Sequence, residues 1–209
     1  QPKWNGNEIA GQRLFVFADQ GFGDTIQFSR FLSEAKPCSQ ASVIFECQPQ
    51  LVETFRNCPS VDRCIAEGND LPEFDAWISL ASLPGLFDVT LETVADFSSE
   101  LEFNSTPRAE LQSLIKSPTE KTRTVGLVWR GNPEQARDHV RSCPPEFLEP
   151  ILGIEKLRFL SLQTGIEKSK DDDWLKRQVK KGLVTDLGSE LRDFTDTSAV
   201  ISQLDLVIT

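Results

Sequence analysis

The sequence of 209 residues contains no methionine and no tyrosine, and it has a single histidine. It also has no apolar run approaching the roughly 18 residues that a membrane-spanning helix needs, and no basic segment followed by an apolar core that would direct export. We therefore expect a cytoplasmic protein without a membrane span. Because there is no initiating methionine and the chain stops directly after the apolar run 204–208, we also expect a fragment of a larger protein.

Paired or clustered cysteines are missing as well. The five cysteines stand singly, without a Cys-x-x-Cys or a cysteine–histidine spacing. We interpret them as reduced thiols, and we expect neither a disulfide framework nor a metal site from them.

Basic residues are few relative to acidic ones. The chain has 22 Lys and Arg against 32 Asp and Glu, which leaves a net charge of -10. Such a charge repels nucleic-acid phosphates and anionic lipid surfaces. Nucleic acid and membranes are therefore not expected as partners.

What the chain does have is a regular alternation of short apolar runs with amphipathic helical patterns. Strands are predicted at 13–18, 41–47, 63–66, 76–80, 124–129, 157–162, 183–185 and 204–208. Helices are predicted at 108–115, 145–152, 172–181 and 195–203, and an earlier one presents Phe28, Phe31, Leu32 and Ala35 on one face. This alternation predicts an α/β fold with parallel sheets.

Two polar stretches, near 98–106 and 117–123, the first followed by Pro107 and the second containing Pro118, interrupt this alternation. The simplest interpretation is two successive Rossmann-like three-layer α/β units joined by a linker. We place the first at residues 1–118 and the second, which is incomplete, at 119–209.

The segment "ADQGFGD", residues 18–24, ends the first predicted strand. Its glycines, Gly21 and Gly23, permit backbone angles and close approaches that a side chain would forbid. The helix that follows points unpaired N–H groups at this turn. Because ligands of open parallel sheets bind beyond the carboxyl ends of the strands, the turn is a candidate anion or polar-ligand site.

Asp24 in this turn allows two compatible interpretations. In the first, it is an N-cap that forms a capping box with Gln27. As a carboxylate at the mouth of a ligand cleft, it would also accept a proton from a substrate hydroxyl.

The same turn also suggests a nucleotide-dependent oxidoreductase or epimerase. A dinucleotide fingerprint would need a third glycine where this chain has Ile26, although Glu46 ends the second strand, which is the place of an NAD-binding acid. Asp24 would compete with a pyrophosphate for the helix N–H groups, so the turn suits a hydroxyl better than a phosphate.

Several blocks together resemble a known family: Trp4-x-Gly6, "GQRLFVFADQGFGDTIQFSRFL", "SLASLP", "VGLVWRGNPEQARDHVRS", "FLSLQTG" and "DTSAVISQLDLVIT". They are similar to the glycosyltransferase domain that often follows tetratricopeptide repeats in bacterial proteins, which itself resembles the heptosyltransferases. The resemblance implies the GT-B fold, with an acceptor in the N-terminal domain and a nucleotide-diphosphate sugar in the C-terminal one. It further implies a protein or glycan acceptor and catalysis without a metal or other cofactor.

The family pattern also continues beyond the last strand, with a segment that grips the donor phosphates. This chain ends at Thr209, before that segment. The alternative is therefore a catalytically inactive binding module.

A locally basic segment follows the strand that ends at Trp129. Between residues 121 and 141 it contains Lys121, Arg123, Arg130, Arg137 and Arg141 against Glu134 and Asp138. Two of these arginines, Arg130 and Arg141, are placed to neutralise a departing diphosphate. On charge alone, a solvated loop explains the segment equally well.

With the resemblance, the site residues can be assigned. The expected donor-binding residues are Arg130, Gly131, Asn132, His139, Arg141, Ser142 and Gln163. The expected acceptor-binding residues are Gln20, Gly21, Gly23 and Ser82, with Asp24 as the catalytic base. As ordinary alternatives, Ser82 and Gln163 are turn residues.

The run Asp171-Asp172-Asp173 contains an Asp-x-Asp, which chelates a cation in metal-dependent glycosyltransferases. Here it opens a predicted helix away from any strand end. Favourable charge at a helix N-terminus explains it better, and we expect no metal there.

Overall fold

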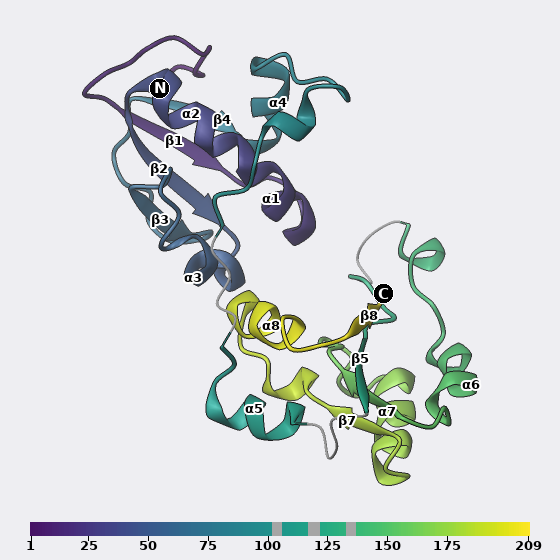
Figure 1. Ribbon diagram of the computed structural model, residues 1–209. Coiled ribbons are helices and arrows are strands. Elements are labelled where there is room, and N and C mark those ends of the chain that lie inside the picture. The colour runs from purple at the N-terminus through teal and green to yellow at the C-terminus, as the bar shows by residue number, and fades with distance from the viewer. Residues whose placement is uncertain (102–105, 117–121, 133–136) are drawn as a thin grey trace. The chain divides into compact units, whose positions relative to one another are not determined.

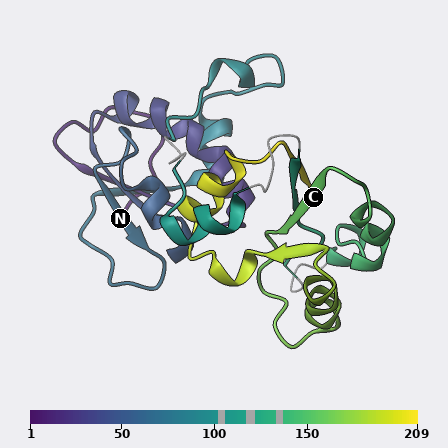
Figure 2. The same cartoon turned by 60° about the horizontal axis from the view of Figure 1, so that its bottom comes forward.

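The structure is a computed structural model that describes residues 1–101, 106–116, 122–132 and 137–209. The chain divides into two compact units, Gln1–Phe103 and Asn104–Thr209 (Figures 1 and 2). Each unit is described by itself below.

The first unit is built on a four-stranded parallel sheet in the order β3-β2-β1-β4. Its strands are β1 (Arg13–Phe17), β2 (Ser42–Cys47), β3 (Arg63–Ala66) and β4 (Ala76–Ser79). Its helices are α1 (Phe22–Phe28), α2 (Leu32–Ser39), α3 (Val52–Phe55) and α4 (Leu83–Leu86), with 3-10 turns between them.

The core of the first unit lies on both faces of this sheet. The centre of β1, from Leu14 to Val16, is buried at three consecutive positions, which is typical of a parallel strand covered on both sides. The helical face expected after the first loop is confirmed, because Phe31, Leu32 and Ala35 are all buried.

The second unit repeats this plan with a parallel sheet in the order β7-β6-β5-β8. Its strands are β5 (Arg123–Leu127), β6 (Leu157–Ser161), β7 (Val184–Asp186) and β8 (Leu206–Ile208). Its helices are α5 (Ala109–Ile115), α6 (Glu149–Leu152), α7 (Lys170–Lys180) and α8 (Phe194–Ile201).

Helices cover both faces of the second sheet, with α6 and α7 on one side and α5 and α8 on the other (Figure 1). On the first side, Trp129 packs edge-on against Trp174 of α7, with ring centroids 5.5 Å apart. On the other side, Leu160 and Leu162 pack with Leu111 of α5 and Val200 of α8. The guanidinium of Arg158 also caps the C-terminal end of α5, where it donates to the carbonyls of residues 114–116.

The predicted α/β fold with parallel sheets is confirmed. Every predicted strand is present, with ends that differ by at most two residues, and the strand Arg63–Ala66 has the predicted bounds. We expected the units to divide at residue 118, whereas they divide between Phe103 and Asn104. Helix α5 therefore belongs to the second unit, where it packs against α8.

No helix in the described part of the chain combines the length and apolar composition that a bilayer crossing requires.

Candidate functional site

Both sheets have a switch point at their carboxyl edge. The chain runs from β1 outward to β3 and then returns to place β4 on the other side of β1, and β5 to β8 follow the same route. Loops leave such a switch point in opposite directions, so a crevice opens between them, and ligands of open α/β sheets bind there. A pocket lies at this position in each unit.

The pocket of the second unit has a volume of about 320 Å³. It lies where β5 and β8 end, and the loop after β5 supplies much of its wall. Its lining comprises Val128, Trp129, Arg130, Gly131, Arg141, Cys143, Leu148, Ile208 and Thr209. Three of the expected donor-binding residues, Arg130, Gly131 and Arg141, are therefore brought together.

Gln163, which follows β6, braces the start of this loop. Its Oε1 accepts hydrogen bonds from the backbone N–H groups of Trp129 (3.0 Å) and Arg130 (2.9 Å). Its Nε2 donates to the carbonyls of Arg130 (3.1 Å) and Thr164 (2.9 Å). These bonds use both donors and both lone pairs of the amide, whose residue is only 6% exposed. Gln163 was expected to contact the nucleotide, but the structure uses its side chain to position the loop.

Arg130 has an anionic partner within the protein. Its Nε and Nη2 donate to the two oxygens of Asp171, at 2.6 and 3.1 Å, and its Nη1 lies 3.8 Å from Asp138. Asp171 is buried and also accepts from Nε1 of Trp129 at 3.1 Å. The hydrogen bond to Asp171 raises the pKa of Arg130. The positive charge of Arg130, which was expected to meet a diphosphate, is thus already partly compensated by Asp171 and Asp138.

The far end of the same loop is closed by a second set of bonds. The hydroxyl of Ser142 donates to Asp138 Oδ1 at 2.5 Å and accepts from the N–H of Gly131 at 3.0 Å. The N–H of Cys143 donates to the carbonyl of Trp129 at 2.8 Å. A Cβ at Gly131 would lie 3.2 Å from Asp138 Oδ1, so the space beside this glycine is tight. Ser142, which was expected to bind the donor, joins the two ends of this loop by these hydrogen bonds.

The remaining residues expected to bind the donor lie on the outside of the loop. Arg141 is exposed and lines the pocket, and none of the ion pairs within the described residues includes it. His139 and Asn132 are exposed, and neither lines the pocket. Lys121 and Glu134, which contributed to the charge count of this segment, lie outside the described residues.

The pocket of the first unit is a narrow hollow between the loops after β1 and β4. It is lined by Ala18, Asp19, Gln20, Asp24, Thr25, Phe28, Leu80 and Ala81. Of the expected acceptor residues, Gln20 lines the hollow and Ser82 is half-buried beside it, at the end of the 3-10 turn Leu80–Ser82.

Gln48, which follows β2, braces this loop much as Gln163 braces the other one. Its Nε2 donates to the carbonyl of Gln20 at 2.6 Å, and its Oε1 lies 3.1 Å from the hydroxyl of Thr25. The same hydroxyl lies 3.1 Å from the carbonyl of Gly21. Gln48 was not among the residues expected at this site, although its place directly after the central strand β2 was a usable signal.

The capping-box interpretation of Asp24 is wrong. Helix α1 begins at Phe22 with Gly21 as its N-cap, and no side chain caps it. Asp24 is the third residue of the helix and is exposed. The carboxylate is favoured there by the positive end of the helix dipole while it remains open to the hollow.

The prediction that the two glycines supply unusual backbone angles is also wrong. Neither Gly21 nor Gly23 has a positive φ. A Cβ at Gly21 would lie 3.6 Å from Asp24 Oδ2, and one at Gly23 would meet nothing within 4 Å. Unusual backbone angles are therefore not what these glycines supply.

Gly188, by contrast, has a steric role that the sequence did not indicate. It follows β7, and a Cβ there would overlap the backbone carbonyl of Gln163. Its N–H donates to Asp186 Oδ1 at 2.9 Å, and burial raises the pKa of the Asp186 carboxyl. The absence of a side chain at Gly188 therefore allows the chain after β7 to pack directly against the backbone of Gln163.

The run Asp171-Asp172-Asp173 starts α7, as predicted, but its members have different roles. Asp172 accepts from the N–H of Lys168 and from Nζ of Lys176, both at 2.8 Å, while Ser169 caps the helix. Asp171 alone faces the core, and nothing in its local sequence distinguishes it. Within the described residues, no three Asp, Glu, His or Cys side chains gather as a metal site would require.

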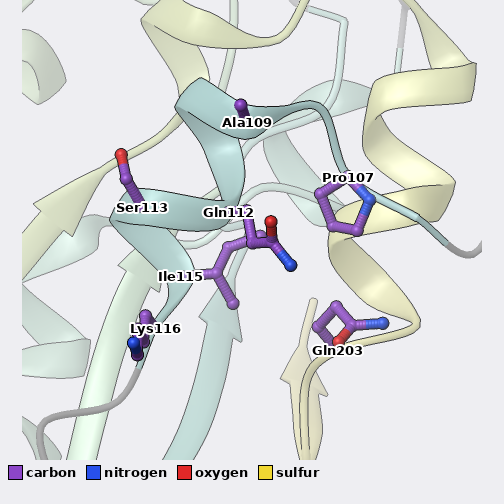
Figure 3. Close-up of a pocket in the computed structure, with 7 residues that line it drawn as sticks. All are labelled: Pro107, Ala109, Gln112, Ser113, Ile115, Lys116 and Gln203. Atoms are coloured by element: carbon purple, nitrogen blue, oxygen red, sulfur yellow. The ribbon is translucent and has the colours of Figure 1, made fainter.

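A larger pocket, of about 510 Å³, lies between α5 and the end of α8 (Figure 3). Its lining includes Lys116, shortly before β5, and Gln203, shortly before β8. It therefore lies at the amino edge of the second sheet, opposite the edge where ligands of such sheets bind.

The comparisons with known proteins concern both sequence and fold. A scan against protein families finds no match. Protein FlbA of Caulobacter vibrioides is 25% identical over 231 residues, which cover 99% of this chain and 37% of FlbA. The chain thus spans little more than a third of that relative.

Two solved structures are similar to nearly the whole chain. A glycosyl transferase family 9 protein from Veillonella parvula matches with a TM-score of 0.63 and 15% identity, covering 97% of this chain and 76% of that one. The E. coli ADP-heptose LPS heptosyltransferase II matches with a TM-score of 0.56 and 10% identity, covering 93% and 78%. The fold is that of these glycosyltransferases.

Proposed function

We propose that this chain is a glycosyltransferase unit that moves a sugar from a nucleotide-diphosphate donor to an acceptor hydroxyl. The fold of the two solved glycosyltransferases supports this proposal. The observation that carries it is the pocket at the switch point of the second sheet, which two arginines line. Anion binding at this edge of an α/β sheet is the general behaviour of such folds.

In this proposal the two arginines have different roles. Arg141 is the exposed cation that meets the donor diphosphate and stabilises its charge as it leaves. Arg130 forms part of the pocket wall and is held there by Asp171, so only the N–H groups that do not bond Asp171 are left to bind the sugar donor. Gly131, Asn132, His139 and Ser142 belong to the same loop and complete the proposed donor side, with Gln163 as its brace.

The acceptor side is assigned to the first unit. Asp24 takes the proton of the acceptor hydroxyl, since it is exposed at the hollow beyond β1 and β4. Gln20 lines this hollow, and we assign Gly21, Gly23 and Ser82, on the loops beside it, to the binding of a protein or glycan acceptor as well. No metal has a role in this mechanism.

The decisive experiment is a calorimetric titration of the chain with ADP, GDP and UDP. ADP belongs in the panel because one of the structural neighbours is described as acting with ADP-heptose. We expect at least one nucleotide to bind, and Arg141→Ala to weaken that binding by about ten-fold or more, as loss of a charged hydrogen bond to phosphate does.

Arg137→Ala is the matched control, because Arg137 is exposed in the same segment and does not line the pocket. Its affinity should equal that of the unaltered chain. If both variants weaken binding equally, the effect comes from the lower net charge and not from a contact with Arg141. If the chain binds NAD and none of the three nucleotides, an oxidoreductase is favoured.

A further inference from the structure

The two units carry a glutamine at the same structural position. The last residue of β1 lies opposite Glu46 of β2, and Gln48 follows two residues further along the chain. The last residue of β5 lies opposite Ser161 of β6, and Gln163 likewise follows two residues further. Because the two sheets have the same strand order, each glutamine stands beside the loop that leaves the first strand of its unit at the switch point.

The side-chain amides of these glutamines also make the same hydrogen bond. Nε2 of Gln48 donates at 2.6 Å to the carbonyl of Gln20, the third residue after β1. Nε2 of Gln163 donates at 3.1 Å to the carbonyl of Arg130, the third residue after β5. Gln20 and Arg130 are therefore equivalent positions, and a glycine follows each of them. The loop of the first unit is held in the same way as the proposed donor loop.

Helix α1, which follows the loop of the first unit, is anchored to the core through Thr25. Its N-cap, Gly21, has no side chain to cap the helix. Among the residues of α1, all of which the structure describes, only Thr25 is buried. The hydroxyl of Thr25 donates to Oε1 of Gln48 at 3.1 Å, with the carbonyl of Gly21 at the same distance. Gln48 therefore binds both the backbone just before α1 and the buried residue within it.

Asp24 directly precedes Thr25 in this helix. Successive residues are turned by about 100° around a helix axis, so the side that carries Asp24 is set once Thr25 is fixed in the core. Asp24 is accordingly exposed and lines the hollow of the first unit. The hydrogen bond between Thr25 and Gln48 thus fixes the rotation of α1 and, with it, the direction of the Asp24 carboxylate.

From this geometry we infer that Gln48 is a positioning residue for Asp24, which it holds at the hollow through Thr25 and the carbonyl of Gln20. This inference rests on the proposed function, in which Asp24 takes the proton of the acceptor hydroxyl. Gln48 is not part of the lining of the hollow and acts through the residues that are. Its replacement should therefore slow transfer without weakening the binding of the donor, which is assigned to the second unit.

The first test is amide hydrogen exchange of the full chain over residues 18–28, a measurement that needs neither donor nor acceptor. Gln48→Ala removes both hydrogen bonds, and we expect this segment to exchange about ten-fold faster. Gln50→Ala is the matched control, because Gln50 is exposed two residues further along the chain, and it should exchange like the unaltered chain. Equal exchange in Gln48→Ala and the unaltered chain would overturn the inference.

The second test separates positioning from stability by measuring sugar transfer, with a sugar donor built on the nucleotide that is found to bind. We expect Gln48→Ala to lower kcat by about ten-fold or more at an unchanged KM for the donor. Val43→Ala, a truncation in the buried part of β2, should lower stability and retain kcat. Thr25→Val, which lacks the hydroxyl, should lower kcat more than Thr25→Ser, which keeps it.

The outcomes distinguish this inference from the proposed function. If Gln48→Ala lowers kcat no further than Val43→Ala, Gln48 has a structural role only and the inference is wrong. If Asp24→Asn loses transfer and Gln48→Ala retains it, the inference alone fails. If Asp24→Asn retains transfer, the proposed function loses its base.

Discussion

The carboxylate of Asp171 accepts two hydrogen bonds from the guanidinium of Arg130, with N–O distances of 2.6 and 3.1 Å. The same carboxylate accepts from the indole N–H of Trp129. One buried side chain on α7 therefore orients two consecutive residues of the loop that lines the pocket of the second unit. Planar, paired hydrogen bonds of this kind set geometry as well as energy.

The first prediction follows from this pair. Asp171→Asn removes the negative charge and leaves the arginine without its partner, which costs several kcal/mol in a fully buried pair. Because the Arg130 side chain is 33% exposed, we expect a smaller loss of about 2 kcal/mol in the free energy of unfolding, measured by urea denaturation.

Asp173→Asn is the matched control for this measurement. Asp173 lies in the same acidic run but is exposed, so its replacement should leave the urea midpoint nearly unchanged. Equal midpoints for both variants would mean that the Arg130–Asp171 pair does not hold the loop.

A second prediction concerns the tight packing behind Gln163. In Gly188→Ala the new methyl group would overlap the Gln163 carbonyl, so the backbone must move. We expect a loss of about 3 kcal/mol, at the upper end for overpacking. Gly153→Ala has no neighbour within 4 Å and an ordinary φ of -92°, and it should change stability by no more than about 0.5 kcal/mol. Similar melting curves for both variants would contradict the assigned role of Gly188.

A third prediction is a pH dependence at Asp186. Burial raises the pKa of this carboxyl in the folded chain above its unfolded value, so the folded state holds the proton more tightly. Its contribution to stability is therefore present below the ordinary aspartate pKa and is lost as the pH rises through the folded pKa. Asp186→Asn should match the unaltered chain in acid and be more stable at neutral pH.

The measurement is the free energy of unfolding of both proteins across the acid-to-neutral range. Only the difference between them is informative, because other carboxyls, such as Asp62 and Asp205, have lowered pKa values and act in the opposite direction. A variant that is less stable at neutral pH would show that the bond from the Gly188 N–H to a charged Asp186 outweighs the cost of burial.

The fourth prediction tests the proposed base. Asp24→Asn in a protein with measurable sugar transfer should lower kcat by about a hundred-fold or more, the usual contribution of a general base, while the affinity for the donor nucleotide stays the same. Asp19→Asn is the matched control, because Asp19 lines the same hollow. If the Asp19 variant loses transfer and the Asp24 variant retains it, the assignment of the base is wrong.

Local patterns were enough to predict the strands and the longer helices, whereas the short helices α3 and α4 were not predicted. The apolar runs around Val16 and Phe159 are buried strands, and the spacing of Phe31, Leu32 and Ala35 predicted the buried face of a helix. These predictions succeeded because a strand or helix must bury its apolar positions at its own period, which is written in consecutive residues. The edge on which ligand loops lie followed from the same alternation.

The roles of individual side chains in those loops were not predictable in this way. Arg130 meets Asp171 across 41 positions of sequence, and Gln163 meets Arg130 across 33. In the sequence Asp171 is the first of three identical residues, yet only it is buried against the loop. Asp24 was assigned to a cap by its spacing from Gln27, whereas the helix starts two residues earlier.

The sequence by itself determined the alternation of elements, the parallel sheets and the placing of polar loops at one edge, because these depend on periodicity and chain direction. Only the tertiary structure decided which charges in those loops are already paired and which amide side chains hold the loops in place by hydrogen bonds. Such contacts join residues that are distant along the chain, and their partners are set by how the strands are ordered in the sheet.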